Sequence, residues 1–262
     1  MAVSNIGLLA RISKKAILGD GKGKTLFEKW REKYDDNKIP RVDENLPLGI
    51  KLGSFIEIDL LSEFTLGEGD FLIPEFEGKG EVYAFGKIEI SSSLKVYRFY
   101  VRSMNEDFED YYLEIGTKTG EVLSIVLYVL YQELDVVEYH DNPVTDDNKA
   151  ALNHWLGGDT PLIGGQDFSI HLEGQKVDYI RIDSPNDNRV ITTEEKEVIY
   201  DEPKDQDLEY INNIVGEYAR AVESTAFGGK EFLVVRASES QSTASIQIFI
   251  GVEISKTQIK VI

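Results

Sequence analysis

Three arginines lie within apolar, strand-like segments, where a cation is expected to bind an anion or to pair with a carboxylate. Arg98, Arg181 and Arg220 are each flanked on both sides by apolar residues. A guanidinium binds a carboxylate or a phosphate through two parallel hydrogen bonds, so the three residues are candidate sites for an anion or a partner. The structural alternative, which we favour, is pairing with carboxylates of the chain such as Glu197 or Glu223.

No other catalytic or metal-binding pattern is complete. The segment GDGKGKT lacks the first glycine of a phosphate-binding loop, because Leu18 occupies its position. The acidic loops 183–194 and 201–209 are similar to calcium loops, but Pro185 and Pro203 stand where a ligand is required. The three histidines are scattered, and no Gly-x-Ser-x-Gly motif marks a nucleophile. We therefore assign no catalytic residue, expect no cofactor or metal, and lean against an enzyme.

The composition is that of an acidic protein without cysteine. The 262 residues include 28 Lys and Arg and 47 Asp and Glu, which gives a formal net charge of −19. The absence of cysteine excludes disulfides, thiolate metal sites and cysteine nucleophiles. The acidity argues against a nucleic-acid partner. The apolar run 122–131 is ten residues long, half of the roughly 20 that a membrane helix needs.

The charge is divided between a basic head and an acidic body. Residues 1–42 contain ten basic and five acidic side chains, a net +5, whereas the remaining 220 residues contain 18 and 42, a net −24. Such asymmetry suggests a separate role for the head. A Gly/Lys linker at 19–24 separates its first part from the rest of the chain.

The first part of the head predicts an amphipathic helix. On a helical wheel of residues 4–18, Arg11, Lys14 and Lys15 lie opposite a broad apolar half. Such a helix can rest on an anionic membrane surface or on a partner, and we expect peripheral contact through residues 1–18. The alternative is a terminal helix that packs on its own domain or frays.

The chain after residue 42 is predicted to be mainly antiparallel β-structure. Short runs rich in Val, Ile, Tyr and Phe alternate with a period of two, and the turns between them are too short for parallel crossovers. We expect strands near 54–59, 70–73, 81–90, 95–102, 111–116, 121–131, 168–172, 176–182, 196–200, 218–223, 231–237 and 245–254.

Further helices are predicted at three places. Residues 25–34 form a short amphipathic pattern, and residues 145–156 have an acidic first turn, an apolar stripe and a Gly-Gly end. A weaker helical pattern covers residues 207–215. The fold class expected from these patterns is α+β, mainly antiparallel β, with two or three helices.

The predicted domain organisation is a basic N-terminal segment followed by one acidic domain. Residues 1–42 form the segment, and residues 43–262 form the β-rich domain. The helix at 145–156 separates two series of strands, which predicts two packed antiparallel sheets or two sub-domains at 43–140 and 160–262.

Several short motifs, in order along the chain, carry a family resemblance. LPLGIKLG at 46–53, followed by an apolar-acidic strand at 55–59, is similar to the opening of the YjfK-type bacterial proteins, a family of unknown function. The resemblance covers residues 46–262 and leaves the basic head outside. It continues through GKI (86–88), YRFY (97–100), WLG (155–157), LIG (162–164), EVIY (197–200), EFLVV (231–235), GVE (251–253) and KVI (260–262).

The resemblance implies a biological setting but no site residue. Family members are similar to cytoplasmic proteins encoded near phage-shock-protein-A-like proteins and small membrane proteins, a setting linked to envelope stress. It implies a protein partner of one of these two kinds, and a cytoplasmic location with possible attachment to the inner membrane. The leading hypothesis is a non-enzymatic interaction module in such a membrane-associated system. The alternative is an enzyme or small-ligand-binding protein with a pocket between the two strand series.

Overall fold

The residues that the computed structural model describes are mostly in β-strands. They are residues 41–59, 71–74, 76–105, 108, 110–138, 167–172, 175–183, 193–204, 209–222, 229–240 and 243–262. These residues contain no α-helix; besides the strands, they form two single-turn 3-10 helices, η1 (Pro47–Gly49) and η3 (Lys256–Gln258). The strands are β1 (Phe55–Ile58), β2 (Lys79–Glu89), β3 (Leu94–Ser103), β4 (Tyr111–Lys118), β5 (Glu121–Glu138), β6 (Asp167–Leu172), β7 (Gln175–Arg181), β8 (Thr193–Tyr200), β9 (Glu209–Ala221), β10 (Lys230–Glu239), β11 (Thr243–Glu253) and β12 (Ile259–Val261).

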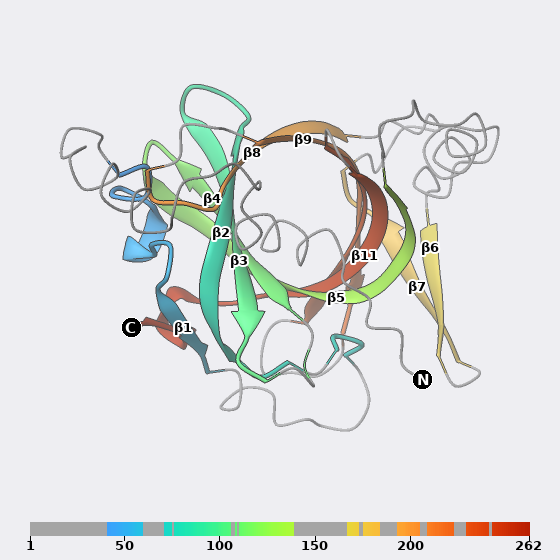
Figure 1. Ribbon diagram of the computed structural model, residues 1–262. Coiled ribbons are helices and arrows are strands. Elements are labelled where there is room, and N and C mark those ends of the chain that lie inside the picture. The colour runs from blue at the N-terminus through green and yellow to red at the C-terminus, as the bar shows by residue number, and fades with distance from the viewer. Residues whose placement is uncertain are drawn as a thin grey trace.

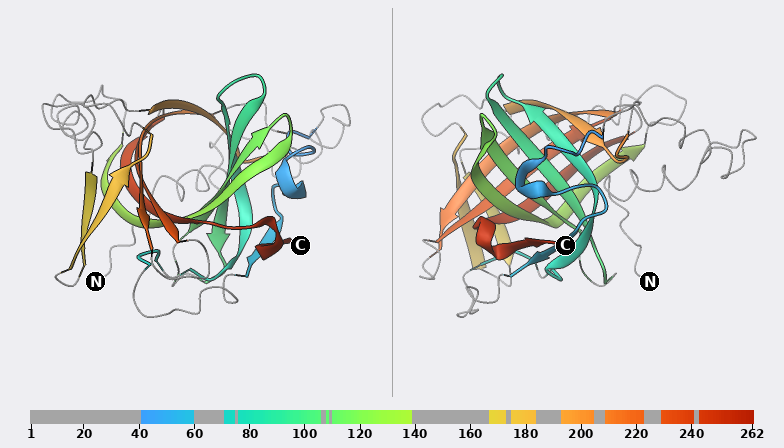
Figure 2. Two further views of the ribbon diagram at one scale, coloured as in Figure 1. Left: turned by 180° about the vertical axis from the view of Figure 1, so that it is seen from behind. Right: turned by 90° about the vertical axis from the view of Figure 1, so that its left-hand side faces the viewer.

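Eight of the strands close into an antiparallel barrel. Around the barrel the order is β2, β3, β4, β5, β11, β10, β9 and β8, and β8 pairs again with β2. In the closing pair Phe85 lies opposite Tyr200. Figure 1 looks along the barrel, and the right-hand view of Figure 2 shows the strands crossing its wall at a tilt. Strands β1 and β12 extend the sheet from β2, and the hairpin β6–β7 extends it from β9.

The interior of the barrel is identified by one cluster of buried side chains. The cluster contains at least one residue from each of the eight barrel strands, so its members share the face that points inward. Four of its members are aromatic, three of them tyrosines. The cluster consists of Ala84, Tyr100, Tyr112, Tyr128, Ile199, Ile211, Val215, Val234 and Phe249.

The outward faces of the barrel strands are covered by apolar residues from outside the barrel. On β2–β5, Phe99 and Leu113 belong to a buried cluster with Ile50, which precedes β1, and Ile56 of β1. On β9–β11, a second cluster packs under the hairpin β6–β7. Many barrel strands are therefore buried on both faces. Successive residues of these strands alternate between the barrel interior and the outer apolar clusters, and neither place is open to bulk water.

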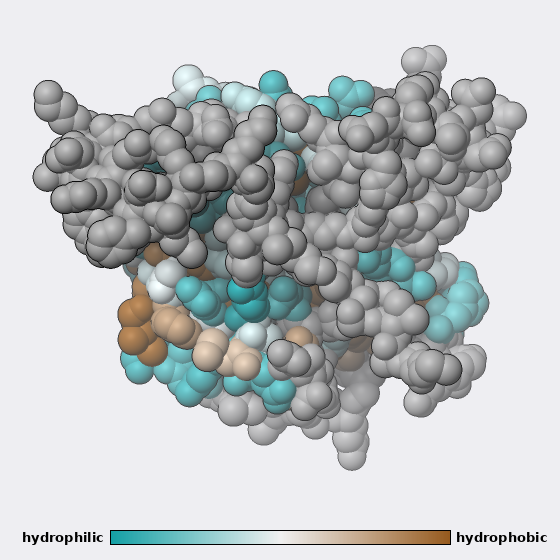
Figure 3. Space-filling model, viewed as in Figure 1, coloured by the Kyte–Doolittle hydropathy of each residue, from teal (hydrophilic) through white to brown (hydrophobic). Residues whose placement is uncertain are grey.

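An apolar area is exposed at the attached pair β1–β12. Phe55 is 41% exposed and Ile262 is 68% exposed, and their backbones hydrogen-bond to each other. In Figure 3 this area is the brown patch at the left, where Figure 1 places β1 and the C-terminus.

The expected α+β class with two packed sheets or sub-domains and two or three helices is wrong. The described strands form a single sheet that closes on itself, because β5 pairs with β11 and β2 pairs with β8 across the two predicted series. The helix predicted at 207–215 is wrong where it is described, since Glu209–Ala221 is strand β9. The other predicted helices, at 4–18, 25–34 and 145–156, lie outside the described residues.

Most of the expected strands are present, with one clear exception. The strand expected at 70–73 is absent from the described segment 71–74, where the amides of Leu72 and Ile73 donate to the carboxylate of Glu231 instead of to a neighbouring strand. Strand β9 begins nine residues before the expected start at residue 218, at Glu209.

Among the described residues, no helix has the length and the apolar character that crossing a membrane would require.

Candidate functional site in the barrel interior

A buried carboxylate, Glu197 of β8, lies at the centre of a polar network inside the barrel. Its side chain is 1% exposed. It accepts hydrogen bonds from Arg98 Nη1 at 3.0 Å, from Tyr100 Oη at 2.7 Å and from Asn213 Nδ2 at 2.9 Å. A Cβ at Gly86 of β2 would lie 1.6 Å from Glu197 Oε1, so the carboxylate needs a glycine at this position.

Arg98 of β3 binds three glutamates at once. Besides Glu197, its Nε donates to Glu114 and its Nη2 to Glu195, each at 2.8 Å. The guanidinium is buried, as is Glu197, whereas Glu114 and Glu195 keep 19% and 9% of their side chains exposed. Three carboxylates around one guanidinium leave this part of the interior with an excess of negative charge.

The network crosses the barrel from β4 to β10. Asn213 of β9 accepts a hydrogen bond from Ser238 Oγ of β10 at 2.7 Å and donates to Glu197. Together with Arg98 and Glu114 these residues join five strands, β3, β4, β8, β9 and β10. Removing one member of such a network leaves buried partners unsatisfied, so the network fixes the register of the strands that carry it.

The two inward-facing glutamates Glu197 and Glu217 have opposite pKa shifts. Burial alone would raise the pKa of Glu197, but the charges of Arg98 and Arg236 hold it below its usual value. For Glu217 of β9 the charge of Arg98 compensates only in part: burial and the charges of Glu114 and Glu195 raise its pKa from 4.5 to about 7. In the described part of the chain its carboxylate has no hydrogen-bond or ion-pair partner.

Arg236 of β10 is a buried cation, and no carboxylate among the described residues accepts a hydrogen bond from it. It is 2% exposed, and its guanidinium carbon lies 5.1 Å from the ring centre of Tyr112 and 4.5 Å from that of Phe249. Cation–π contact stabilises the charge but uses none of the N–H donors. Two of them, at Nε and Nη1, are buried without an acceptor. Buried donors without partners are rare, and an ion, a ligand or a water is the usual reason.

Further polar atoms near Arg236 are also buried without a hydrogen-bond partner. Their side chains belong to β2, β4 and β11, and Gln247 lies directly opposite Arg236 in the strand register. The ring centre of Tyr112 lies 5.1 Å from the Arg236 guanidinium carbon, and the charge of Arg236 opposes the rise in pKa that burial causes at both tyrosines among them. The atoms are Tyr83 Oη, Tyr112 Oη, Ser245 Oγ and Gln247 Oε1.

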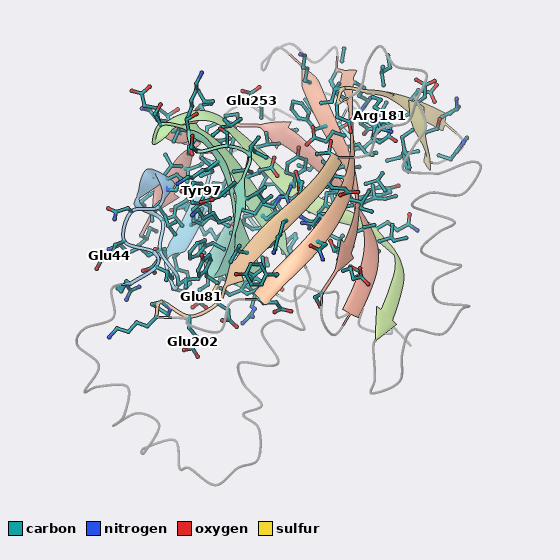
Figure 4. All side chains as sticks on the ribbon, turned by 90° about the horizontal axis from the view of Figure 1, so that it is seen from above. Glu44, Glu81, Tyr97, Arg181, Glu202 and Glu253 are labelled. Carbon is teal, nitrogen blue, oxygen red and sulfur yellow. The ribbon has the colours of Figure 1, made fainter. Side chains whose placement is uncertain are left out.

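The other two arginines singled out from the sequence lie on the outer side of the barrel. Arg181 pairs with Asp183 and stacks over Tyr218, and Arg220 pairs with Glu231 at 2.7 Å. Figure 4 shows Arg181 beside the hairpin β6–β7, on the opposite side of the view from Tyr97, the neighbour of Arg98. The structure therefore does not bring the three arginines into one site.

Each of the three arginines has a carboxylate partner. Glu197, named above as a structural partner, is bound to Arg98, whereas Glu223 lies outside the described residues. The candidate membrane-binding residues Arg11, Lys14 and Lys15 also lie outside the described residues.

Sequence reasoning missed Arg236 and Glu217. Arg236 has the same sequence pattern as Arg98, a cation between apolar residues of a strand, and this pattern could have identified it. Glu217 carried no signal, because its environment is made by Glu114 and Glu195 of other strands.

Among the residues that the structure describes, no group of three or more His, Cys, Asp or Glu side chains is arranged to hold a metal ion. Asp183, the first residue of the acidic loop 183–194, forms an ion pair with Arg181.

The comparison with protein families matches residues 26–260 to a family model described as a protein of unknown function, DUF2491. The chain belongs to the DUF2491 family. The match confirms the expectation of a family of unknown function and extends it to residue 26, within the basic head, while the YjfK-type name stays a prediction. No curated protein and no solved structure matched this DUF2491 chain.

Proposed function

We propose that this DUF2491 protein is a non-enzymatic binding protein whose barrel interior holds a small anionic ligand at Arg236. The observation that carries the proposal is a buried guanidinium with two donors that lack acceptors. Eight-stranded barrels are wide enough either to be filled by side chains or to hold one small ligand.

The local chemistry supports an anion at this position. The hydroxyls of Tyr83 and Tyr112 are also buried without a hydrogen-bond partner, and the Tyr112 ring lies against the Arg236 guanidinium. Glu197 does not meet this need, because its oxygens already accept from Arg98, Tyr100 and Asn213. A carboxylate or phosphate would form charge-assisted hydrogen bonds with the free donors.

The direct test is isothermal titration calorimetry of the full chain with acetate, butanoate, succinate and inorganic phosphate. We expect at least one of these anions to bind, and the variant Arg236→Gln to lose that binding. Arg41→Gln is the matched control, because Arg41 is 40% exposed and pairs with Asp43 outside the barrel. No heat with any anion, or equal binding by wild type and Arg236→Gln, would refute the proposal.

Stability measurements separate a binding role of Arg236 from a structural role. A buried charge without hydrogen-bond partners costs free energy in the ligand-free protein, so Arg236→Met is expected to raise the free energy of unfolding by about 1 kcal/mol. Chemical denaturation without added anions measures this value. A loss of more than about 1 kcal/mol would show that Arg236 supports the fold instead.

A second candidate function, peripheral membrane association within an accessory system, rests on the charge division of the sequence. The net +5 of residues 1–42 against −24 for the rest favours contact of the head with an anionic surface. The family resemblance, with its membrane-protein setting, points the same way and suggests a phage-shock-protein-A-like or small membrane protein as partner.

Co-sedimentation of the full chain with vesicles that contain phosphatidylglycerol tests this role. The triple variant Arg11→Glu, Lys14→Glu, Lys15→Glu is expected to reduce the bound fraction several-fold, and binding of the wild type is expected to fall with added salt. The control reverses three exposed lysines of the acidic body, Lys118, Lys230 and Lys256. Equal loss in both triple variants, or no binding by the wild type, would exclude a specific role of the head.

A further inference from the structure

Two charges of opposite sign lie on the inward face of the barrel, and among the described residues neither has a hydrogen-bonded partner of the other sign. Arg236 of β10 has two buried donors without an acceptor, and Glu217 of β9 is a half-buried carboxylate with a raised pKa. Glu217 faces inward, because it lies two residues after Val215 and six after Ile211 in strand β9, and these two residues belong to the interior cluster. The charges of Glu114, Glu195 and Arg98, which also face inward, act on it.

The two side chains start from neighbouring positions on adjacent strands. In the register, Val234 lies opposite Glu217 and Arg236 lies opposite Val215, so Arg236 and Glu217 are diagonal neighbours on the inward face. Diagonal neighbours in an antiparallel pair are about 7–8 Å apart. Two long side chains can meet across this distance, yet no ion pair joins them.

The two charged groups have different electrostatic surroundings. The guanidinium lies against the rings of Tyr112 and Phe249, whereas the charges that act on the pKa of Glu217 are mainly those of Glu114 and Glu195. Val215, opposite Arg236, and Val234, opposite Glu217, occupy the other diagonal of the same four positions, and both belong to the interior cluster. The line from Arg236 to Glu217 on the inward face is therefore flanked by two apolar side chains.

We propose that the ligand is a small zwitterion, an aliphatic amino acid, with its carboxylate on Arg236, its methylene groups over Val215 and Val234, and its ammonium group on Glu217. This inference rests on the proposed binding function and deepens it. The excess of carboxylates around Arg98 favours a cationic group at the Glu217 end, just as the free donors of Arg236 favour an anionic group at the other.

Three compounds of matched size test the inference by calorimetry with the full chain at pH 8. They are 4-aminobutanoate, which has both charges, butanoate, which has only the anion, and butylamine, which has only the cation. We expect 4-aminobutanoate to bind at least ten-fold more tightly than either of the others.

Two substitutions assign the ends of the site. Glu217→Gln keeps the shape of the side chain and removes its charge, and it is expected to remove the preference for 4-aminobutanoate over butanoate. Arg236→Gln is expected to abolish binding of both. Glu253→Gln, on the exposed end of β11, is the matched control and is expected to bind as the wild type does.

The outcomes separate this inference from the proposed function. If none of the anions binds, the anion-binding function itself fails. If butanoate binds as tightly as 4-aminobutanoate, or if Glu217→Gln keeps the preference, the zwitterion assignment is wrong while an anion site at Arg236 stands.

Discussion

At the scale of single residues, the interior of this barrel contains both satisfied and unsatisfied charges. Glu197 has three hydrogen-bond donors and a lowered pKa, and it holds strands together. In the described part of the chain Arg236 has two buried donors without an acceptor, and the half-buried Glu217 has no hydrogen-bonded counter-ion. Charged groups with perturbed environments inside a fold are candidates for a functional role.

Glu217 makes stability depend on pH with a defined sign. Its pKa is raised from 4.5 to about 7 in the folded chain, so its contribution to stability is complete below pH 4.5 and is lost as the pH rises through 7. This difference in pKa corresponds to a loss of about 3 kcal/mol in the free energy of unfolding at pH 8.5. Glu217→Gln is therefore expected to raise the free energy of unfolding at pH 8.5 and to change it little at pH 4.

Urea denaturation at the two pH values measures this difference, with Glu253→Gln as the control. A stabilisation that is equal at pH 4 and pH 8.5 would show that the effect does not come from the charge of Glu217.

At the scale of elements, the barrel is held to its outer cover by a second buried carboxylate. Glu231 of β10 is fully buried, and it accepts from the amides of Leu72 and Ile73 at 2.6 and 3.0 Å, and from Tyr179 Oη at 2.8 Å. Together with Arg220, these contacts join the segment 71–74 and the strand β7 to the barrel wall. Arg220, which the sequence offered as an anion site, has this carboxylate as its partner.

Glu231→Ala is expected to release this cover. The substitution leaves two amides, a hydroxyl and a guanidinium without their acceptor, and we expect it to lower the free energy of unfolding by about 3–5 kcal/mol. Hydrogen exchange of the Leu72 and Ile73 amides is expected to become faster in this variant under conditions in which the rest of the protein stays folded. Glu121→Ala, at an exposed strand end, is the control, and unchanged exchange at Leu72 and Ile73 would contradict the assigned contact.

At the scale of the whole molecule, the two halves of the chain complete each other's sheet. Strands β5 and β11 pair along the full length of β11, and β8 closes the barrel against β2. Val252 and Ile254, from the end of the chain, belong to the buried cluster that covers β2–β5. Neither half retains a closed sheet without the other.

The described barrel is therefore expected to unfold in one cooperative step. Hydrogen-exchange mass spectrometry should give the same opening free energy for peptides from β3–β4 and from β9–β10, because closure couples them. Two separate transitions, one for 43–140 and one for 160–262, would contradict this coupling through closure.

Local patterns predicted which segments are strands but failed where both faces of a strand are covered. In β9, Ile211, Ile214 and Val215 recur at positions i, i+3 and i+4, which fits a helix. In the barrel, Ile211 and Val215 face inward while Ile214 packs on the outer cluster, so the same residues form a strand. Register and closure could not be predicted, because the pair Phe85–Tyr200 joins residues far apart in the chain.

The sequence by itself determined the alternation of the strands, the absence of cysteine chemistry, the division of charge and the family. Only the tertiary structure decided which face of each strand lines the barrel interior and which face packs against the outer cover. Alternation with a period of two shows that Arg98, Glu114, Glu195, Glu197 and Arg236 share faces distinct from their apolar neighbours. In an open sheet such a face meets water, but here the sheet closes and the apolar faces are covered from outside. The polar faces are consequently enclosed, and what reads in sequence as a solvated surface becomes the candidate binding site.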